Sequence, residues 1–495
     1  MDLQKRSDML AKAKKMLSDK SESAKIRKDG KKTAYDLMNL LFDDGTFSET
    51  GAFVKAYANE IGTTDPAEYE GVVCGYGAVD GRLVFAYAQD ISRTNGAFSK
   101  AAAGKITALY DLAVKNGAPV VSMLDSIGAK ITEGVDVLAG YGSIFKKSAC
   151  VKGKIPQVAI ILGEATGAGA LLASMSDASV ICEGATFCQS PANVLVEAGA
   201  SKDAGTAKYA ADNGLASVYT ANPEEAVLNA KEILAYLPSN RLDKNVYAGA
   251  EDDPNRATPE ISAIVAKADY DVHEIIKAIA DGGVYKELTA AKSGALVTAF
   301  AFINGLPCGI VANNPAVKSG KLCAGGLRKA VNFVGLCNSF GLPVLNLVGT
   351  AGFDEKCEAH GGRVSELAAA LAKAYATAEV PVVTVNVGEA YGTAFAVMGS
   401  KALGADIVYA LDSAKIGPLK PSSSVAMMWS EKLAGSRAPI EKRKSLEEEW
   451  ELYMTTPILA ANAGQIDDII SDEQLRAKIA SAMEMLSMKS EFAKL

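Results

Sequence analysis

Short apolar runs alternate along most of the chain with longer segments whose apolar residues recur at helical spacing. Apolar runs of about four to eight residues are typical of buried strands, and longer periodic segments are typical of helices. From residue 71 onward, the pattern predicts strands over residues 72–77, 83–87, 120–124 and 158–162, and helices over residues 101–115, 135–146 and 223–237. This alternation predicts an α/β fold.

Local turn and capping signals agree with these elements. Asp80-Gly81 separates the first two strands and is typical of a two-residue hairpin turn. Asn222 stands where it can cap the helix that follows, and Pro223 occupies the first helical position. The lysine-rich residues 1–29 predict a solvated helix ahead of the body of the protein.

The most distinctive stretch of the sequence is residues 158–167, because its motif occurs twice. The apolar run 158–162 leads into Gly-Glu-Ala-Thr-Gly at residues 163–167, which predicts a buried strand, a short glycine-rich turn and a helix start. Such a turn brings bare backbone N–H groups close to any ligand above it. The motif Gly-Glu-Ala-x-Gly returns at residues 388–392, at an offset of 388 − 163 = 225.

Two further landmarks recur at nearly the same offset. The hairpin glycines Gly81 and Gly305 lie 224 residues apart (305 − 81), as do Pro119 and Pro343 (343 − 119). A repeat of this length is a duplicated domain, because solenoid repeats have periods of about 20–50 residues. The landmarks near the end of the second copy have a larger offset, which predicts an insertion over the charged residues 431–449.

The duplication gives a domain plan. We expect a helical extension over residues 1–30, a first domain over residues 31–250 and a second over residues 251–495. The boundary falls in a stretch rich in turn-forming and charged residues, which includes residues 238–240 and 252–255.

Composition narrows the class of protein. The 495 residues are 49% hydrophobic and 22% charged, and the net charge of −7 argues against nucleic acid as the main partner. The eight cysteines form no C-x-x-C pair, which predicts reduced thiols, a cytoplasmic location and no zinc site. No apolar stretch reaches 18 residues, so we expect no membrane span.

Backbone N–H groups are the first candidate chemistry. The turns at Gly167-Ala168 and at Gly392-Thr393-Ala394 each offer a pair of donors at a helix start. Such donors hold an oxyanion that forms only during reaction, and one donor contributes about 3–4 kcal/mol. The alternative is a packing turn between strand and helix. Two copies at matched positions favour function.

Side-chain candidates are few. Only His273 and His360 occur, so a Ser-His-Asp triad or a histidine metal site is not expected. We expect His273 to be structural and keep His360 as a loop candidate. Glu164 and Glu389 occupy equivalent places, where a carboxylate can serve as a general base or simply favour a helix start. Basic candidates for a negatively charged ligand, each also compatible with a solvated surface, are Arg93, Lys100, Lys105 and Lys130.

Several motifs, in order, resemble the carboxyltransferase subunits of biotin-dependent acyl-CoA carboxylases. The group includes propionyl-CoA carboxylase β subunits, the transcarboxylase large subunit and the α subunits of methylmalonyl- and glutaconyl-CoA decarboxylases. The resemblance runs from about residue 33 to about residue 489. Its motifs are Asp-Ser-x-Gly-Ala at 125–129, Leu-Ala-Gly-Tyr at 138–141, the turn at 163–170, Val-Ala-Asn-Asn-Pro at 311–315, and Ala-Tyr-Gly-x-Ala at 390–394.

The resemblance implies two tandem crotonase-like (ClpP/crotonase) domains of spiral ββα units that arose by duplication. It implies acyl-CoA on the first domain, biotin on the second, and a site between the first domain of one subunit and the second of its partner. Hexamers built as trimers of dimers are common in the group. In that scheme, Gly167 and Ala168 hold the thioester enolate oxygen, and Thr393 and Ala394 hold the biotin ureido oxygen.

The resemblance also assigns ligand positions. The CoA-binding set is Ala97, Ser99, Lys100, Lys105, Ser126, Gly128, Ala129 and Lys130. The biotin-side set is Gly352, Phe353, Tyr391, Gly392 and Ala396. The chain departs from the family pattern at Ser126-Ile127-Gly128-Ala129-Lys130, where a second glycine and an arginine are usual, and at Ala396, where relatives carry a residue that sorts acyl chains.

Cofactor and partners follow from the resemblance. No Ala-Met-Lys-Met occurs, so biotin is expected on a separate carrier protein. The other expected partner is a biotin carboxylase or a membrane decarboxylase β subunit, in which case the chain would lie at the membrane periphery. We expect transfer between biotin and a propionyl/methylmalonyl- or acetyl/malonyl-CoA. The alternatives are a sodium-pump decarboxylase α subunit, a biotin-independent hydratase or isomerase that uses Glu164, and an inactive CoA-binding scaffold.

Overall fold

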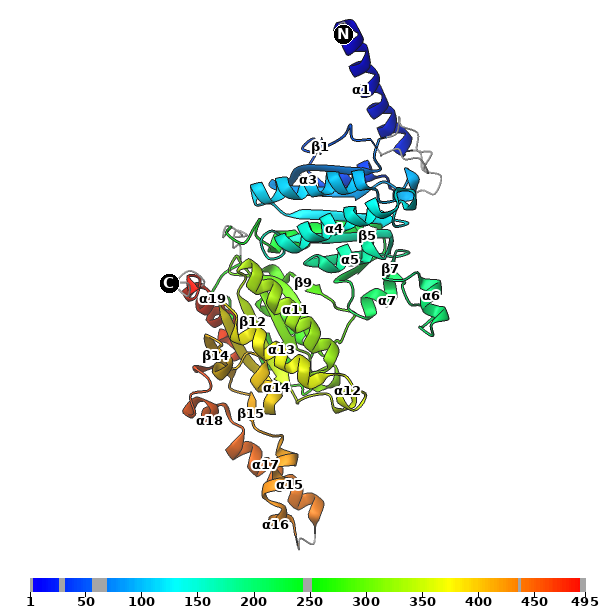
Figure 1. Ribbon diagram of the computed structural model, residues 1–495. Helices are drawn as coiled ribbons and strands as arrows, with labels where there is room; N and C mark the ends of the chain where they lie inside the picture. The colour runs from blue at the N-terminus through cyan, green and yellow to red at the C-terminus, as the bar shows by residue number, and fades with distance from the viewer. Residues whose placement is uncertain (1–2, 26–31, 56–68, 244–251, 435–437, 490–495) are drawn as a thin grey trace. The chain divides into compact units, whose positions relative to one another are not determined.

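The structure is a computed structural model that describes residues 3–25, 32–55, 69–243, 252–434 and 438–489 (Figure 1). The chain forms two compact units, Met1–Lys244 and Asn245–Leu495, and each is built around one eight-stranded sheet. The predicted α/β class and the duplication are therefore confirmed. No described helix combines the length and the apolar character that a membrane span requires.

The first sheet joins an antiparallel edge to a parallel centre. Strands β1, β2 and β3 pair antiparallel, and β3, β4, β5, β6 and β8 continue in parallel, with β7 paired to β5. The strands are β1 Ser48–Thr50, β2 Val72–Val79, β3 Arg82–Gln89, β4 Val120–Ser126, β5 Gln157–Thr166, β6 Ala178–Cys182, β7 Thr186–Cys188 and β8 Val218–Thr220.

Helices cover this sheet or lead to it. They are α1 Leu3–Lys25, α2 Ala34–Leu41, α3 Lys100–Asn116, α4 Val135–Val151, α5 Ala168–Met175, α6 Ala192–Glu197, α7 Ala207–Asp212 and α8 Pro223–Tyr236, with short 3-10 turns η1 Thr94–Gly96 and η2 Ile131–Glu133. Helix α8 begins as the sequence predicts, with the Asn222 side chain accepting from the Glu225 N–H and Pro223 in the first position. Figure 1 shows α3 and α4 running side by side.

The second sheet repeats the plan. Its order is β16-β14-β13-β12-β11-β10-β9, antiparallel from β9 to β11 and parallel from β11 onward, with β15 paired to β13. The strands are β9 Tyr285–Leu288, β10 Leu296–Ile303, β11 Leu306–Asn313, β12 Val344–Thr350, β13 Val382–Tyr391, β14 Ile407–Leu411, β15 Lys415–Gly417 and β16 Asp468–Ile470.

Helices and short 3-10 turns also accompany the second sheet. They are α9 Glu260–Val265, α10 Val272–Ile279, η3 Asp281–Gly283, η4 Lys318–Gly320, α11 Ala324–Phe340, α12 Glu355–Ala359, α13 Val364–Ala376, α14 Gly392–Val397, η5 Lys401–Leu403, α15 Pro421–Met428, α16 Ser430–Leu433, α17 Pro439–Met454, α18 Pro457–Asn462, η6 Asp472–Gln474 and α19 Leu475–Met485.

Both hairpins use the predicted two-residue turn, and both turns are held by an aspartate. Asp80 and Gly81 have φ of 50° and 75°, values that a type I′ turn requires, and their N–H groups donate to the Asp43 carboxylate. In the second unit Asn304 and Gly305 have φ of 53° and 72° and donate to Asp281. The duplication thus extends to the side chain that fixes the hairpin.

The central strands are longer than their apolar runs. Residues 158–161 of β5 are fully buried, but the strand continues through the predicted turn to Thr166. Its second half acquires a new neighbour, because Glu164 pairs with Thr186 of β7. β13 continues in the same way beside β15. The glycine-rich turn of the prediction is therefore mostly strand, and only Gly167 turns the chain.

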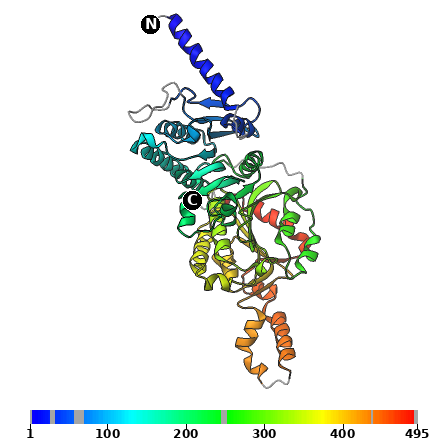
Figure 2. The same cartoon turned by 90° about the vertical axis from the view of Figure 1, so that its right-hand side faces the viewer.

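The insertion predicted at residues 431–449 is confirmed. Where the first unit passes directly from α6 to α7, the second unit adds α16 and α17 between α15 and α18. The added helices pack on α15 through Val425, Leu446 and Trp450, with Trp429 edge-on to Trp450 at 4.9 Å between ring centroids. Figure 2 shows α15 to α17 projecting from the sheet of their own unit.

A buried ion cluster ties the last helix to the hairpin of the second unit. Arg476 of α19 is fully buried and donates to the Asp281 carboxylate at 2.5 Å and to the Asp253 carbonyl. Asp252 lies 3.4 Å from the same guanidinium and also binds Arg256 in a bidentate pair at 3.0 and 3.1 Å. Asp281 therefore depends on the buried Arg476, and Asp252 is shared between Arg476 and Arg256.

We predict that Arg476→Met lowers the free energy of unfolding by about 3 kcal/mol, because it leaves the mostly buried Asp281 carboxylate without its cation, whereas Asp252 keeps Arg256. Urea unfolding followed by circular dichroism measures the change. The control is Lys208→Met, which breaks an exposed pair with Asp212 and should change stability by less than about 0.5 kcal/mol. Equal effects of the two variants would contradict the prediction.

Candidate functional site

The central strands of the first sheet carry an irregularity at their carboxyl ends. The parallel pairing of β4 with β5 matches Leu124 to Ile161 and then Ser126 to Ala165. One residue on β4 therefore stands opposite three on β5. Bulges of this kind re-aim the chain beside functional sites, and ligands of open α/β sheets bind beyond the carboxyl ends of the strands.

The second sheet carries the same irregularity at the same place. Val348 of β12 pairs with Asn386 of β13, and Thr350 then pairs with Ala390, so Gly349 alone faces three residues. Because the bulge is repeated within the duplication, we take the two carboxyl edges beyond it as the candidate functional site of each unit.

Asp125 fills the bulge of the first unit. Its carboxylate accepts the Glu164 N–H at 3.2 Å. A Cβ added to Gly163 would lie 2.1 Å from Asp125 Oδ1, which no side chain tolerates. The first glycine of the Gly-Glu-Ala-x-Gly motif is therefore required by close approach of a carboxylate.

The second glycine of the motif makes the turn. Gly167 has φ 62° and ψ −113°, and α5 begins at the next residue. The Gly167 N–H donates to the Cys188 carbonyl at 2.9 Å, so the expectation of two free donors at Gly167 and Ala168 is wrong for Gly167. The hydrogen bonds of the described residues leave the Ala168 N–H unpaired.

A second unpaired N–H belongs to Ala129. The chain around it forms a bridge with Phe98, whose N–H donates to the Gly128 carbonyl and whose carbonyl accepts the Lys130 N–H, each at 2.8 Å. This pattern turns the Ala129 N–H to the other side, and no described residue accepts it. Ala129 and Ala168 each lie three residues beyond the paired Ser126 and Ala165. The sequence analysis placed Ala129 in the CoA-binding set but did not identify its N–H group as a candidate donor.

The turn of the second unit matches the first. Gly392 has φ 64°, like Gly167, so Thr393 is the counterpart of Ala168. Thr393 is exposed and Ala394 is buried. Within the part of the chain that the structure describes, neither of their N–H groups has an acceptor, as the sequence-based prediction requires.

The loop after β12 matches the loop after β4. Gly352 has φ 129°; its N–H donates to Thr350 Oγ1 at 3.2 Å and its carbonyl accepts the Leu322 N–H at 3.0 Å. The Phe353 N–H then has no acceptor among the described residues. Phe353 and Thr393 lie three residues beyond the paired Thr350 and Ala390, as Ala129 and Ala168 do in the first unit.

Two serines of the predicted CoA-binding set serve their own chain. Ser99 is fully buried, caps α3 by accepting the Ala102 N–H at 2.9 Å and donates to Glu70 at 2.7 Å. Ser126 is buried and accepts the Gly128 N–H at 3.1 Å. The structure gives both hydroxyls a structural role, because helix capping and the loop turn already occupy them.

The predicted lysines separate into buried and exposed groups. Lys105 is 6% exposed, donates to the Val72 carbonyl and lies 3.9 Å from Glu49, so the expectation that it reaches a ligand is wrong. Lys130 is mostly buried and lies 3.7 Å from Glu133. Lys100 is exposed, with its Nζ 3.2 Å from Asp136. Ala97 is buried, and the Arg93 guanidinium donates to the Tyr69 carbonyl at 3.1 Å.

Residues of the predicted biotin side surround the turn at Gly392. Tyr391 is buried, and burial together with Glu389 and Glu451 raises the pKa of its hydroxyl. Ala396 is exposed on α14, the helix that starts at this turn. The Lys420 Nζ lies 3.9 Å from the Glu389 carboxylate. Glu164, the counterpart of Glu389, is exposed and accepts from Thr166 Oγ1 at 3.5 Å.

The histidines lie outside this arrangement. His273 is held between Asp271 at 2.5 Å and Glu287 at 3.0 Å, and these carboxylates, Glu287 first, raise its pKa to about 9. The structural role expected for it is thus supported. His360 is exposed, and its Nδ1 meets the Lys356 carbonyl of the preceding turn at 2.7 Å.

Cysteines and acids offer no metal centre in the described part of the chain. No group of three His, Cys, Asp or Glu side chains there converges as metal ligands. All eight cysteines are free thiols, and five of them are buried. The arrangement leaves backbone amides as the chemical feature common to both units.

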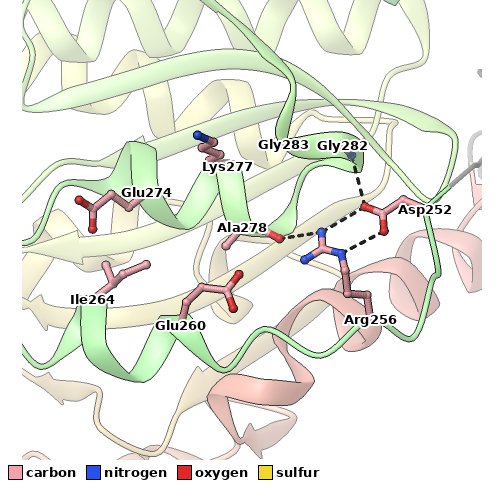
Figure 3. A pocket seen from close by; sticks show the side chains of 9 residues that line it. All are labelled: Asp252, Arg256, Glu260, Ile264, Glu274, Lys277, Ala278, Gly282 and Gly283. Carbon is pink, nitrogen blue, oxygen red and sulfur yellow. Dashed lines mark hydrogen bonds and ion pairs between the residues drawn. The ribbon is translucent and has the colours of Figure 1, made fainter.

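A cavity of about 530 Å³ opens elsewhere in the second unit (Figure 3). Figure 3 shows Arg256 held by the Asp252 carboxylate and the Ala278 carbonyl on one side of it. The cavity lies beside η3, whose Asp281 binds the hairpin turn at the start of β11. Since β11 runs parallel to β12, this is the amino edge of the sheet, opposite to the candidate site.

Comparison with known proteins identifies one family over most of the chain. Residues 25–495 match the carboxyl transferase domain family. The methylmalonyl-CoA decarboxylase subunit alpha of Propionigenium modestum is 34% identical over 473 residues, covering 93% of this chain and 91% of that protein. The methylmalonyl-CoA carboxyltransferase 12S subunit of Propionibacterium freudenreichii subsp. shermanii is 34% identical over 94% of this chain and 90% of its own.

A solved structure of a related carboxyltransferase also matches this chain over almost its whole length. The transcarboxylase 12S hexamer, crystallised with methylmalonyl-coenzyme A and methylmalonic acid, matches with a TM-score of 0.89 at 32% identity, over 99% of this chain and 97% of that one. The family resemblance drawn from the motifs and the fold of two crotonase-like domains are confirmed by these matches.

We predict that Gly163→Ala lowers the free energy of unfolding by about 1–3 kcal/mol, because the new methyl group collides with Asp125. Chemical denaturation measures the loss. Gly104→Ala on α3 is the matched control, since nothing lies within 4 Å of its added Cβ; it should be neutral or stabilise by up to about 1 kcal/mol. A neutral Gly163→Ala would contradict the close approach.

We predict a pH-dependent stability term from His273. Its pKa is raised in the folded state from 6.5 to about 9, so the protonated ring stabilises the fold below pH 6.5 and this contribution is lost as the pH rises through about 9. Denaturation of wild type and His273→Gln between pH 6 and 9.5 measures it. The stability difference should shrink across this range, and a constant difference would contradict the assignment.

Proposed function

This chain belongs to the carboxyl transferase domain family, and on that premise we propose that it is a biotin-dependent acyl-CoA carboxyltransferase. It moves a carboxyl group between biotin and the α-carbon of a short-chain acyl-CoA. The fold is shared almost end to end with relatives that carry out this class of reaction.

The repeated pair of unpaired amides carries the proposal. Each unit presents two N–H groups beyond its bulge, Ala129 and Ala168 in the first and Phe353 and Thr393 in the second. Ala129, Ala168 and Phe353 are half-buried, where a donor without an acceptor is unfavourable unless a ligand supplies one, and Thr393 is exposed and so accessible to a ligand. Two matched pairs fit a reaction with two carbonyl oxygens that gain negative charge.

We assign the thioester oxygen to the first unit and the biotin ureido oxygen to the second. In the first unit, Ala129 and Ala168 donate to the oxygen that becomes an enolate when the α-proton leaves. In the second, Phe353 and Thr393 donate to the ureido oxygen, with Ala394 behind them at the same helix start. Biotin supplies the carboxyl group, and its ring nitrogen exchanges a proton with the α-carbon.

Backbone donors of this kind are fixed before the reaction. They need no reorganisation as charge develops, which is why such sites lower the barrier to enolate formation. The proposal therefore requires no side-chain nucleophile and no metal, in accord with the two histidines being engaged in local contacts. Glu164 and Glu389 stand at the entrance to each turn and act there as helix-start carboxylates.

We propose a propionyl/methylmalonyl- or acetyl/malonyl-type substrate. The small, exposed side chain of Ala396 lies at the position where the resemblance places a residue that sorts acyl chains. In the first unit, Lys100 and Lys130 are the predicted lysines that retain some exposure. They are the proposed contacts for the CoA phosphates, and Lys105 is withdrawn from that role because it is buried.

We further propose the assembly in which this chain works. Biotin is carried by a separate carrier protein, and the third component is a biotin carboxylase or a membrane decarboxylase β subunit. A homo-hexamer is proposed because the 12S relative was solved as one. The same half-reaction serves carboxylation and decarboxylation, so the partner sets the direction.

We predict that Ala168→Pro lowers kcat by about 10²–10³-fold, because it removes one oxyanion donor. Proline suits the first helical position, and the Gly167 φ and ψ of 62° and −113° mirror the extended conformation that a residue before proline requires. Carboxyl exchange between free biotin and methylmalonyl-CoA measures kcat, and the KM for the thioester should change little.

Val135→Pro is the matched control. Val135 also opens a helix after a positive-φ glycine, Gly134 with φ 57° and ψ −132°, and it is exposed. The control should keep wild-type kcat. An Ala168→Pro enzyme that is folded by circular dichroism and as active as Val135→Pro would overturn the assignment of this amide.

A further inference from the structure

Different side chains fill the bulges of the two units. Where the first unit has Asp125, the second has Gly349, and the hydroxyl of Tyr270 takes the space instead. A Cβ added to Gly349 would lie 2.4 Å from the Tyr270 hydroxyl oxygen, and one added to Gly388 would lie 2.8 Å from it. Two glycines on neighbouring strands therefore make room for one phenol group.

This hydroxyl has no partner in the described part of the chain. Tyr270 is 4% exposed, and its oxygen is buried without a hydrogen bond there. Asp125, by contrast, accepts the Glu164 N–H. A buried polar group without a partner costs about 1–3 kcal/mol. Since phenylalanine would fill the same space without that cost, stability alone does not account for the hydroxyl.

Glu389 directly follows Gly388, the glycine beside this hydroxyl. Burial, and then the field of Glu389, raise the pKa of Tyr270, so it stays a neutral donor. Glu389 acts in the same way on Tyr391, whose buried hydroxyl is also unpaired among the described residues. The Glu389 carboxylate is half-exposed, and the Lys420 Nζ lies 3.9 Å from it, at the outer limit of an ion pair.

The position links the hydroxyl to the second site. Gly388 and Glu389 form the three-residue side of the bulge, and Gly392, which turns the chain towards Thr393, follows three residues after Glu389. A contact that fixes Glu389 therefore fixes the strand end that presents the Thr393 N–H. The hydroxyl is buried beside Gly349 and Gly388 and does not line the surface of the site.

We propose that Tyr270 is a positioning residue of the second site, whose hydroxyl donates to the Glu389 carboxylate when a ligand occupies the site and so holds the Thr393 amide in place. The inference rests on the proposed function, because it takes the ligand of the second unit to be biotin. It is the counterpart of Asp125, with a neutral donor in place of a carboxylate acceptor.

The test compares Tyr270→Phe, Glu389→Gln and the double variant. We expect Tyr270→Phe to unfold with wild-type or higher free energy, to raise the KM for free biotin about fivefold, and to leave the KM for methylmalonyl-CoA unchanged. Glu389→Gln should act in the same direction. The double variant should be no worse than the more severe single variant, because both act on one contact: Tyr270→Phe removes its donor, and Glu389→Gln replaces its charged acceptor with a weaker neutral one.

Tyr375→Phe is the matched control. It removes a buried hydroxyl that donates to Asn346 at 2.6 Å in the same unit, so it should lower stability and leave both KM values unchanged. The proposal is overturned if Tyr270→Phe keeps the wild-type KM for biotin, if its effect multiplies with that of Glu389→Gln, or if it destabilises the protein as Tyr375→Phe does. Wild-type protein without biotin-dependent exchange would instead refute the proposed function.

Discussion

The structure depends on one local constraint, the close approach of a side chain to glycine at the end of two parallel strands. Asp125 lies so near Gly163 that no other residue fits there. Beyond the shift in register at this point, β5 still pairs with β4 on one side, and on the other side it pairs with β7 in place of β6. That part of β5 ends at Gly167, and the helix that starts there exposes its first amide. A regular strand would have ended with its amides in the ladder and presented none of them.

Duplication has kept this geometry and changed its chemistry. The bulge, the positive-φ turn and the three-residue spacing to an unpaired amide recur at Gly388, Gly392 and Thr393. What fills the bulge does not recur, because a carboxylate accepts a backbone N–H in the first unit, whereas the phenol in the second unit has no hydrogen-bond partner among the described residues. The same backbone frame with different supporting side chains is compatible with the proposal that the two units hold oxygens of two different molecules.

Periodicity and turn chemistry predicted most of the fold. The hairpins and the capped start of α8 follow from local rules that tertiary packing did not override, and the inserted helices follow from the changed offset between the two copies. The site was harder to predict, because it depends on where each amide points. The Gly167 N–H was expected to be a free donor, but it donates to the carbonyl of Cys188 in β7. Lys105 looked like a surface lysine, but its place on the inner face of α3 buries it. No periodic signal distinguishes these cases, since both depend on pairing between distant segments.

The proposed mechanism asks little of side chains. Main-chain donors to an oxyanion do not depend on the identity of the residue that provides them, so the proposed donor positions can be Ala129, Phe353 and Thr393 without loss of the N–H group. Selection then acts on the backbone conformation, through the glycines that permit it, and on the groups that brace it from behind. Departures from a family motif at the donor positions therefore leave the chemistry intact, whereas a change at Gly163, Gly388 or their bracing partners would move every donor at once. On this view the functional residues of the protein are those that shape its strands rather than those that line its surface.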